Sequence, residues 1–184
     1  MTITRWPNLA RDFERARRHT GYEGAVRKTL HVVTSPGFQA VWGYRATRWL
    51  LHRRIAFVGA VLQRLVEIVT GISIPPEAAI GPGLLIHHFG GIVINSRAVL
   101  GADCTLHHGV TIGNRVPGGP SPVLGDRVML GAGAKVLGDI TIGSGAEIGA
   151  NAVVLESVPE GAVAVGIPAR VVRRQPGDAP QPAG

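Results

Sequence analysis

The sequence has little cysteine and few aromatic residues. Its single cysteine, Cys104, excludes a disulfide framework and a zinc site built on cysteines. Aromatic residues make up only 5% of the chain, and the basic clusters at 11–18 and 170–174 lack the interleaved aromatics of a base-stacking surface. We therefore expect no nucleic-acid partner, although a net charge of +7 would attract anionic ligands or lipids in general.

Long apolar runs are also lacking. The longest, Ile55 to Val69, is interrupted by Gln63, Arg64 and Glu67, so it is too short and too polar to span a membrane. The start of the chain shows no basic segment followed by an apolar core and a small-residue cleavage site. These absences predict a cytoplasmic protein, and 184 residues of ordinary composition predict one globular unit with a core of its own.

The composition changes near residue 70. Between 55 and 69 apolar residues recur at steps of three and four, which predicts an amphipathic helix. Further helices are expected at about 38–53, after the Ser35-Pro36-Gly37 breaker, and at about 9–18. Residues 1–70 are therefore predicted to form an N-terminal helical region.

After residue 70 the chain repeats with a period of six. In steps of six from 94 to 154, ten of eleven positions are large and aliphatic, and the exception is Gly118. A second frame from Ile74 to Ile92 runs ahead of the first and is offset from it by two residues. The positions of the main frame are Ile94, Leu100, Leu106, Ile112, Leu124, Leu130, Val136, Ile142, Ile148 and Val154.

A period of six suits short strands joined by tight turns rather than a helix or a long strand. Three such strands complete a coil of about eighteen residues, whose aliphatic side chains stack inward while neighbouring coils pair about 4.8 Å apart. A glycine-rich linker or an irregular sandwich would not produce this regularity. We predict a parallel β-solenoid over 71–172, with the N-terminal helices covering the first coil. A disordered tail is predicted at 173–184.

These [Leu/Ile/Val]-Gly-x-x-x-x repeats resemble the left-handed β-helix of the hexapeptide acyltransferases. The likeness is greatest to the serine O-acetyltransferase branch, including exopolysaccharide relatives such as the colanic acid acetyltransferases. It implies a mainly β fold with a small helical region, acetyl-CoA as co-substrate, and a homotrimer with its sites between subunits. The segments that carry it lie at 36–40, 44–45, 70–72, 88–94, 109–113, 131–135 and 165–170.

Two pairs of adjacent histidines are the candidates for catalysis. Acyl transfer to an alcohol needs a base and an oxyanion donor, and histidine suits the first task. The repeat places His88 and His108 at the same corner of successive coils, where their side chains would stack. A single histidine there would more often be an ordinary surface residue. The resemblance, however, places His88 on the family's catalytic histidine, so we predict His88 as general base and His108 as an acceptor ligand or oxyanion donor.

Departures from the serine enzymes concern the acceptor. The carboxylate that supports the catalytic histidine of the serine enzymes is missing here, where the aligned segment begins with Ser73. His87 stands where those enzymes tend to have aspartate. Their Asp-Arg-His-Pro stretch aligns with Gly119 to Pro122. An amino-acid carboxylate prefers a bidentate cation, and Arg115 could supply one by position only. We therefore favour a saccharide acceptor, with L-serine as the alternative, and expect His87 and Arg115 to contact it.

For the donor, small residues at successive corners would let a pantetheine arm lie along the solenoid, as the resemblance implies. The small residues could equally be required only by the tight turns of the coil. The basic residues could be ordinary solvent-exposed charges. The predicted CoA-binding residues are Gly113, Ala132, Gly133, Lys135, Ala150, Arg170 and Arg173.

Three alternatives remain. Zinc-dependent β-helices that hydrate carbon dioxide use a His-x-x-x-x-His spacing that is absent here, and adjacent histidines on a strand point to opposite faces, so we predict no metal. A non-enzymatic scaffold is possible because solenoid surfaces often bind partners. The basic, apolar helix at 55–69 would also suit peripheral membrane contact.

Overall fold

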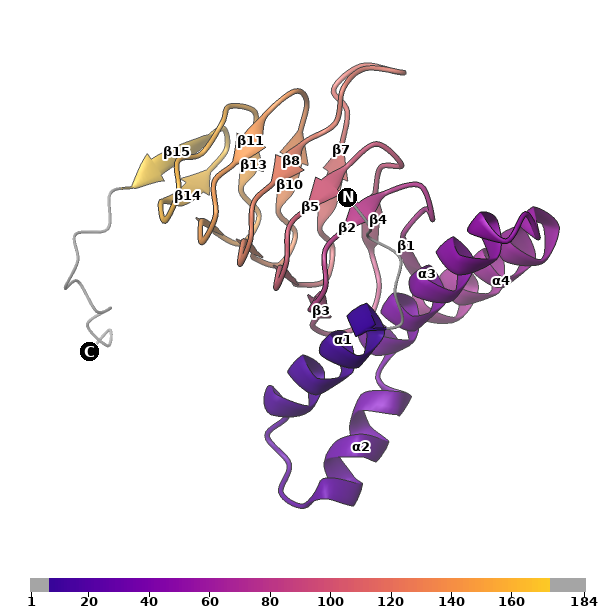
Figure 1. Cartoon of the computed structure of the whole chain (residues 1–184). Coiled ribbons are helices and arrows are strands. Elements are labelled where there is room, and N and C mark those ends of the chain that lie inside the picture. Colours follow the sequence, from indigo (N-terminus) through magenta and orange to yellow (C-terminus); the bar gives the residue numbers. More distant parts are fainter. Residues whose placement is uncertain (1–6, 173–184) are drawn as a thin grey trace.

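The computed structural model describes residues 7–172 and shows four helices followed by a three-sided solenoid of short parallel strands, with one antiparallel strand, β15, at its C-terminal end (Figure 1). The solenoid confirms the predicted fold class. The predicted tail lies outside the described residues. The helices are α1 (Pro7–Arg18), α2 (Ala25–Thr34), α3 (Pro36–His52) and α4 (Ala56–Thr70).

Helix α2 was not predicted from the sequence. Val32 is its one buried residue, so it lacks the continuous apolar stripe that periodicity detects.

The Ser35-Pro36-Gly37 breaker also starts a helix. The Ser35 side chain accepts a hydrogen bond from the Phe38 amide, and Pro36 occupies the first turn of α3, where a missing amide proton costs nothing.

The strands form the three sides of the solenoid, and their order along each side follows the chain. Sheet A contains β1 (Ile72–Ser73), β4 (Ile92–Ile94), β7 (Thr111–Gly113), β10 (Lys135–Leu137) and β13 (Val153–Val154). Sheet B contains β2 (Ala79–Ile80), β5 (Val99–Leu100), β8 (Val123–Leu124) and β11 (Thr141–Ile142). Sheet C contains β3 (Leu85–Ile86), β6 (Thr105–Leu106), β9 (Met129–Leu130), β12 (Glu147–Ile148), β14 (Val163–Gly166) and β15 (Ala169–Val172).

The ladder explains the two-residue offset between the repeat frames. Ile86 pairs with Leu106, and Val93 pairs with Thr111, so the turn after β3 is two residues longer than the turn after β6. The other irregularity is the break at Gly118, which lies in the loop between β7 and β8. Both insertions leave the inward aliphatic stack intact. All ten aliphatic positions of the main frame are buried, with at most 2% exposure.

Helix α3 lies against the first coil, which it covers as the sequence predicts. A Cβ added to Gly37 would stand 2.3 Å from the carbonyl oxygen of Ile86, so only glycine allows this approach. The Tyr44 hydroxyl donates to the Ala78 carbonyl at 2.7 Å, and the Arg45 guanidinium donates to the Ile80 and Gly81 carbonyls. These bonds satisfy carbonyl groups that the end of a solenoid would otherwise leave exposed.

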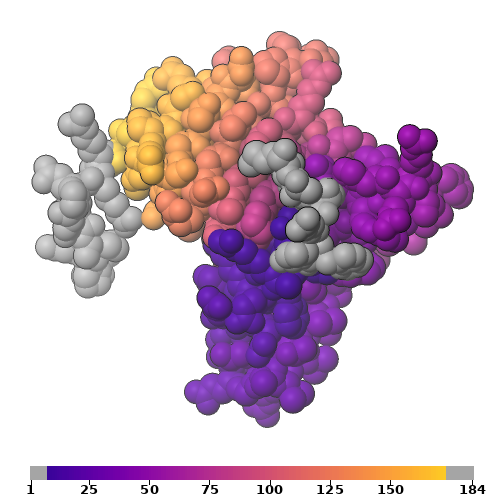
Figure 2. Space-filling model, in the orientation of Figure 1, coloured from indigo at the N-terminus to yellow at the C-terminus, as the bar shows by residue number. Residues whose placement is uncertain are grey.

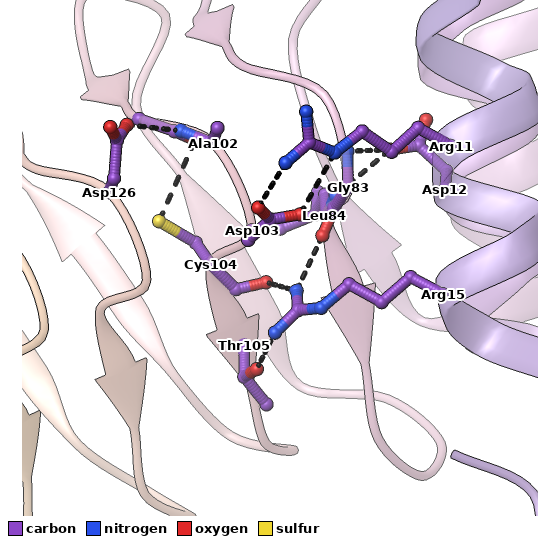
Figure 3. A network of polar contacts seen from close by, with 11 residues as sticks. Arg11, Asp12, Arg15, Gly83, Leu84, Ala102, Asp103, Cys104, Thr105 and Asp126 are labelled. Atoms are coloured by element: carbon purple, nitrogen blue, oxygen red, sulfur yellow. Dashed lines mark hydrogen bonds and ion pairs between the residues drawn. The ribbon is translucent and has the colours of Figure 1, made fainter. Parts of the chain in front are cut away.

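Helix α1 is fastened to the edge of sheet C by a polar network (Figure 3). The fully buried Asp12 carboxylate accepts the amides of Gly83 and Leu84 at 2.6 and 2.9 Å and pairs with Arg45. Beside it Arg15 donates to the Cys104 carbonyl at 2.7 Å, while Arg11 forms a more exposed ion pair with Asp103. Because the network joins α1 to two successive coils, it fixes the helical region over the beginning of the solenoid.

No helix within residues 7–172 is long and apolar enough to cross a membrane.

Candidate active site

The four paired histidines lie at one corner of the solenoid, where the chain turns from sheet C to sheet A. We call this the histidine corner and define it as 87–91 together with 107–110. The pairing of β3 with β6 aligns His87 and His88 with His107 and His108, so the predicted juxtaposition of His88 and His108 is present.

The ring geometry differs in detail from the prediction. The stacked pair is His87 and His107, with centroids 4.9 Å apart and planes at 23°. His88 and His108 meet edge to face, at 5.6 Å and 82°. The expectation that adjacent histidines point to opposite faces is wrong here, because the turn is not a strand: His88 has a φ of 67°, and its ring lies 6.1 Å from that of His87.

The two rings of each adjacent pair have different environments. His87 and His107 are half-buried, and burial, with a further contribution from the neighbouring imidazoles, lowers the pKa of both below the ordinary 6.5. His88 and His108 are exposed. The inner pair is therefore held neutral at physiological pH, and the outer pair is accessible to a substrate.

A groove of about 420 Å³ opens beside His87 and His88, between the first coil and helices α1 to α3. Its polar lining includes His19, His31 and Ser35, and none of the lining residues within 7–172 is an aspartate or a glutamate. Its apolar lining includes Phe38 and Phe89. The groove is large enough for a small acceptor and brings it to the edge of His88.

The histidine corner continues along the solenoid as a ridge of small residues. The backbone carbonyl of His108 accepts a hydrogen bond from the Gly133 amide at 2.8 Å, and the backbone carbonyl of Ala132 accepts one from the Asn151 amide at 2.7 Å. Ala150 is exposed on the next coil. Lys135 reaches back to this ridge, since its ammonium donates to the Gly109 carbonyl. Four predicted CoA-binding residues, Ala132, Gly133, Lys135 and Ala150, therefore lie on one line with the histidines.

The other predicted site residues lie elsewhere in the single chain. Gly113 ends β7, at the opposite end of that strand from His108, and is buried. Arg115 follows in the loop, where its side chain packs over Gly138, because a Cβ added there would meet the Arg115 side chain at 2.7 Å. Arg170 is exposed on β15. Arg173 lies outside the described residues.

Sequence reasoning did not single out His19 and His31 as groove residues. No periodic signal connects them to the repeat, because only the packing of α1 and α2 beside the first coil brings them near His87. The sequence shows His107 as part of a pair but indicates no role of its own for it.

Other chemistries find little support among residues 7–172. No group of three or more histidine, cysteine or carboxylate side chains there is arranged to hold a metal ion. Glu77 cannot pair with His88 as a supporting carboxylate, because it is exposed in the turn between β1 and β2, at another corner of the coil. Burial raises the pKa of the Cys104 thiol to about 11, so it is not an activated nucleophile.

Comparisons with known proteins agree with this geometry. A family model described as bacterial transferase hexapeptide (six repeats) matches residues 121–156. The serine acetyltransferase of Helicobacter pylori (strain J99 / ATCC 700824) is 45% identical over 141 residues, which are 76% of this chain and 82% of that enzyme. The serine acetyltransferase of Mycobacterium tuberculosis (strain ATCC 25618 / H37Rv) is 45% identical over 139 residues, which are 74% of this chain but only 61% of that enzyme.

Solved structures give the same result over more of the chain. Soybean serine acetyltransferase complexed with serine superposes with a TM-score of 0.82 at 35% identity, over 90% of this chain and 68% of that one. A serine acetyltransferase in complex with CoA gives 0.79 at 36% identity, over 90% and 68%. The chain therefore belongs to the serine acetyltransferase family of hexapeptide-repeat acyltransferases, which have the left-handed β-helix fold.

Proposed function

We propose that this protein transfers the acetyl group of acetyl-CoA to the hydroxyl of L-serine. The observation that carries the proposal is the 45% identity to serine acetyltransferases together with a histidine corner that places His88 at the mouth of a groove. The comparisons support this alternative better than the saccharide acceptor favoured from the sequence departures.

His88 is the proposed general base. Its imidazole removes the proton of the serine hydroxyl as the oxygen attacks the thioester carbonyl, forming a tetrahedral intermediate. Collapse of the intermediate breaks the carbon–sulfur bond, and the proton passes from His88 to the leaving sulfur. The products are O-acetylserine and CoA.

His108 and His87 have supporting roles in this proposal. The edge-to-face contact of His108 with His88 places it where it can orient the base or donate to the oxyanion. His87 lines the groove and is kept neutral, so it offers a hydrogen bond rather than a positive charge to the acceptor.

Acetyl-CoA would lie along the small-residue ridge. The line through Gly133 and Ala150 leaves room for a pantetheine arm, and Lys135 supplies a cation beside it. Arg170 and Arg173 are proposed to bind the CoA phosphates, and this proposal rests only on their positions in the sequence.

The described part of the chain contributes no carboxylate to the groove lining, which has a consequence for serine. Its ammonium group would have to be held by carbonyl, hydroxyl and imidazole acceptors of this chain. We therefore expect a higher KM for L-serine than an ion pair would give.

An acceptor screen tests the proposal. CoA release by the purified full chain would be measured with acetyl-CoA and L-serine, D-serine, homoserine or free and nucleotide-linked sugars, and products would be identified by mass spectrometry. We expect turnover with L-serine and formation of O-acetylserine. Turnover with a sugar but not with L-serine would show that the acceptor is wrong, while the absence of turnover with any acceptor would favour a non-enzymatic solenoid.

A further inference from the structure

Helix α4 presents an apolar face that no part of residues 7–172 covers. At 100° per residue, six of its large apolar side chains fall on one arc, and all are between 46% and 81% exposed. The opposite side packs on α3, where Val66 contacts Gly43 and Gly59 lies against Thr47. The exposed residues are Phe57, Val58, Val61, Leu65, Ile68 and Val69.

The α3–α4 hairpin that carries this face projects away from the solenoid (Figures 1 and 2). Its far end adds further exposed apolar side chains, among them Trp49, Leu51 and Ile55. An apolar surface of this extent on a projecting element is typical of a docking surface rather than of ordinary surface composition.

The charge around the apolar face is of one sign. Arg53, Arg54 and Arg64 are exposed on the hairpin, and the Arg53 guanidinium lies over the Trp49 ring, 5.3 Å from its centroid. Between residues 36 and 70 the sequence has a single carboxylate, Glu67. Its side chain is only 16% exposed and is held by Arg64 and Ser73. The surface around the apolar stripe is therefore basic.

We propose that the α3–α4 hairpin docks on an anionic lipid surface, with α4 lying parallel to it. The apolar stripe would enter the boundary between headgroups and acyl chains, Trp49 would lie at the level of the headgroups, and the arginines would contact lipid phosphates. The 15-residue length of α4 suits a helix that lies in the interface rather than one that spans it. A second copy of this face is a poorer occupant, because it would bring arginine against arginine.

Vesicle sedimentation with the full chain tests the proposal. We expect binding at low salt to vesicles of equal parts phosphatidylcholine and phosphatidylglycerol, and little binding to phosphatidylcholine alone. Arg53→Gln and Arg54→Gln should each weaken binding about fivefold, and Phe57→Ser about tenfold. Val26→Ser is the matched control, since Val26 on α2 is as exposed as Phe57 (81%) but lies outside the hairpin, and it should bind like the parent.

The readout is independent of the proposed acceptor, and acetyl transfer in solution should be unchanged in all four variants. Circular dichroism of each variant would confirm that the fold is retained. No binding to anionic vesicles, or an equal loss with Val26→Ser, would overturn the proposal. It would also fail if Phe57→Ser changed only the sedimentation coefficient of the protein, because the face would then be an interface between copies.

Discussion

His88 combines an exposed ring with a left-handed backbone. Its φ of 67° lies in the left-handed region, which few non-glycine residues adopt but which histidine, asparagine and aspartate adopt more often than the others. The surrounding turn enforces it, since Gly90 and Gly91 also have positive φ. The residue whose chemistry the proposed reaction requires therefore lies in a left-handed turn.

Replacing His88 by asparagine should remove the base while keeping the backbone conformation, because asparagine tolerates positive φ. We expect kcat to fall about 10²- to 10⁴-fold and the free energy of unfolding to change by about 0.5 kcal/mol. Steady-state kinetics with the best acceptor and urea unfolding provide the two measurements. A variant that keeps the parental kcat would exclude His88 as the base. His108→Ala should lower kcat by a smaller factor.

The half-buried imidazoles of His87 and His107 should make stability depend on pH. Their folded pKa values lie below the ordinary 6.5, so the unfolded chain takes up protons at a higher pH than the folded chain. Their contribution to stability is complete above 6.5 and is lost as pH falls through the lowered values. In thermal unfolding between about pH 7.5 and pH 5, His87→Gln should show a smaller loss of Tm than the parent. An equal slope would contradict this assignment.

At the scale of elements, the attachment of α1 depends on one buried carboxylate. Asp12 is completely buried with Arg45, and its removal would leave the guanidinium without its charge partner. We expect Asp12→Ala to cost about 3–5 kcal/mol. The matched control is Arg11→Ala, which breaks a pair exposed by 54% and 25% and should cost about 0–1 kcal/mol. Urea unfolding of both variants gives the comparison, and equal costs would show that the buried pair does not fasten the helix.

At the scale of the whole molecule, the resemblance implies a homotrimer, which a single chain does not test. Within one chain, Arg115 and His108 lie beyond opposite ends of β7. A neighbouring subunit could bring the two regions together. Sedimentation equilibrium should give three times the chain mass of 19.3 kDa. A fully active species at the mass of one chain would exclude a site between subunits.

The solenoid and its core can be predicted from the chain's six-residue aliphatic period, because that period is buried only if every turn brings the next aliphatic residue inward. Ile86 and Leu106 kept this register across the two-residue insertion, so the neighbourhood of His88 and His108 was also predictable. Which imidazoles stack becomes visible only in the folded chain, since it depends on the left-handed turn at His88. The tertiary structure also places His19 and His31 in the groove and leaves the apolar face of α4 uncovered. These features arise from packing between elements distant in the chain, which local periodicity does not encode.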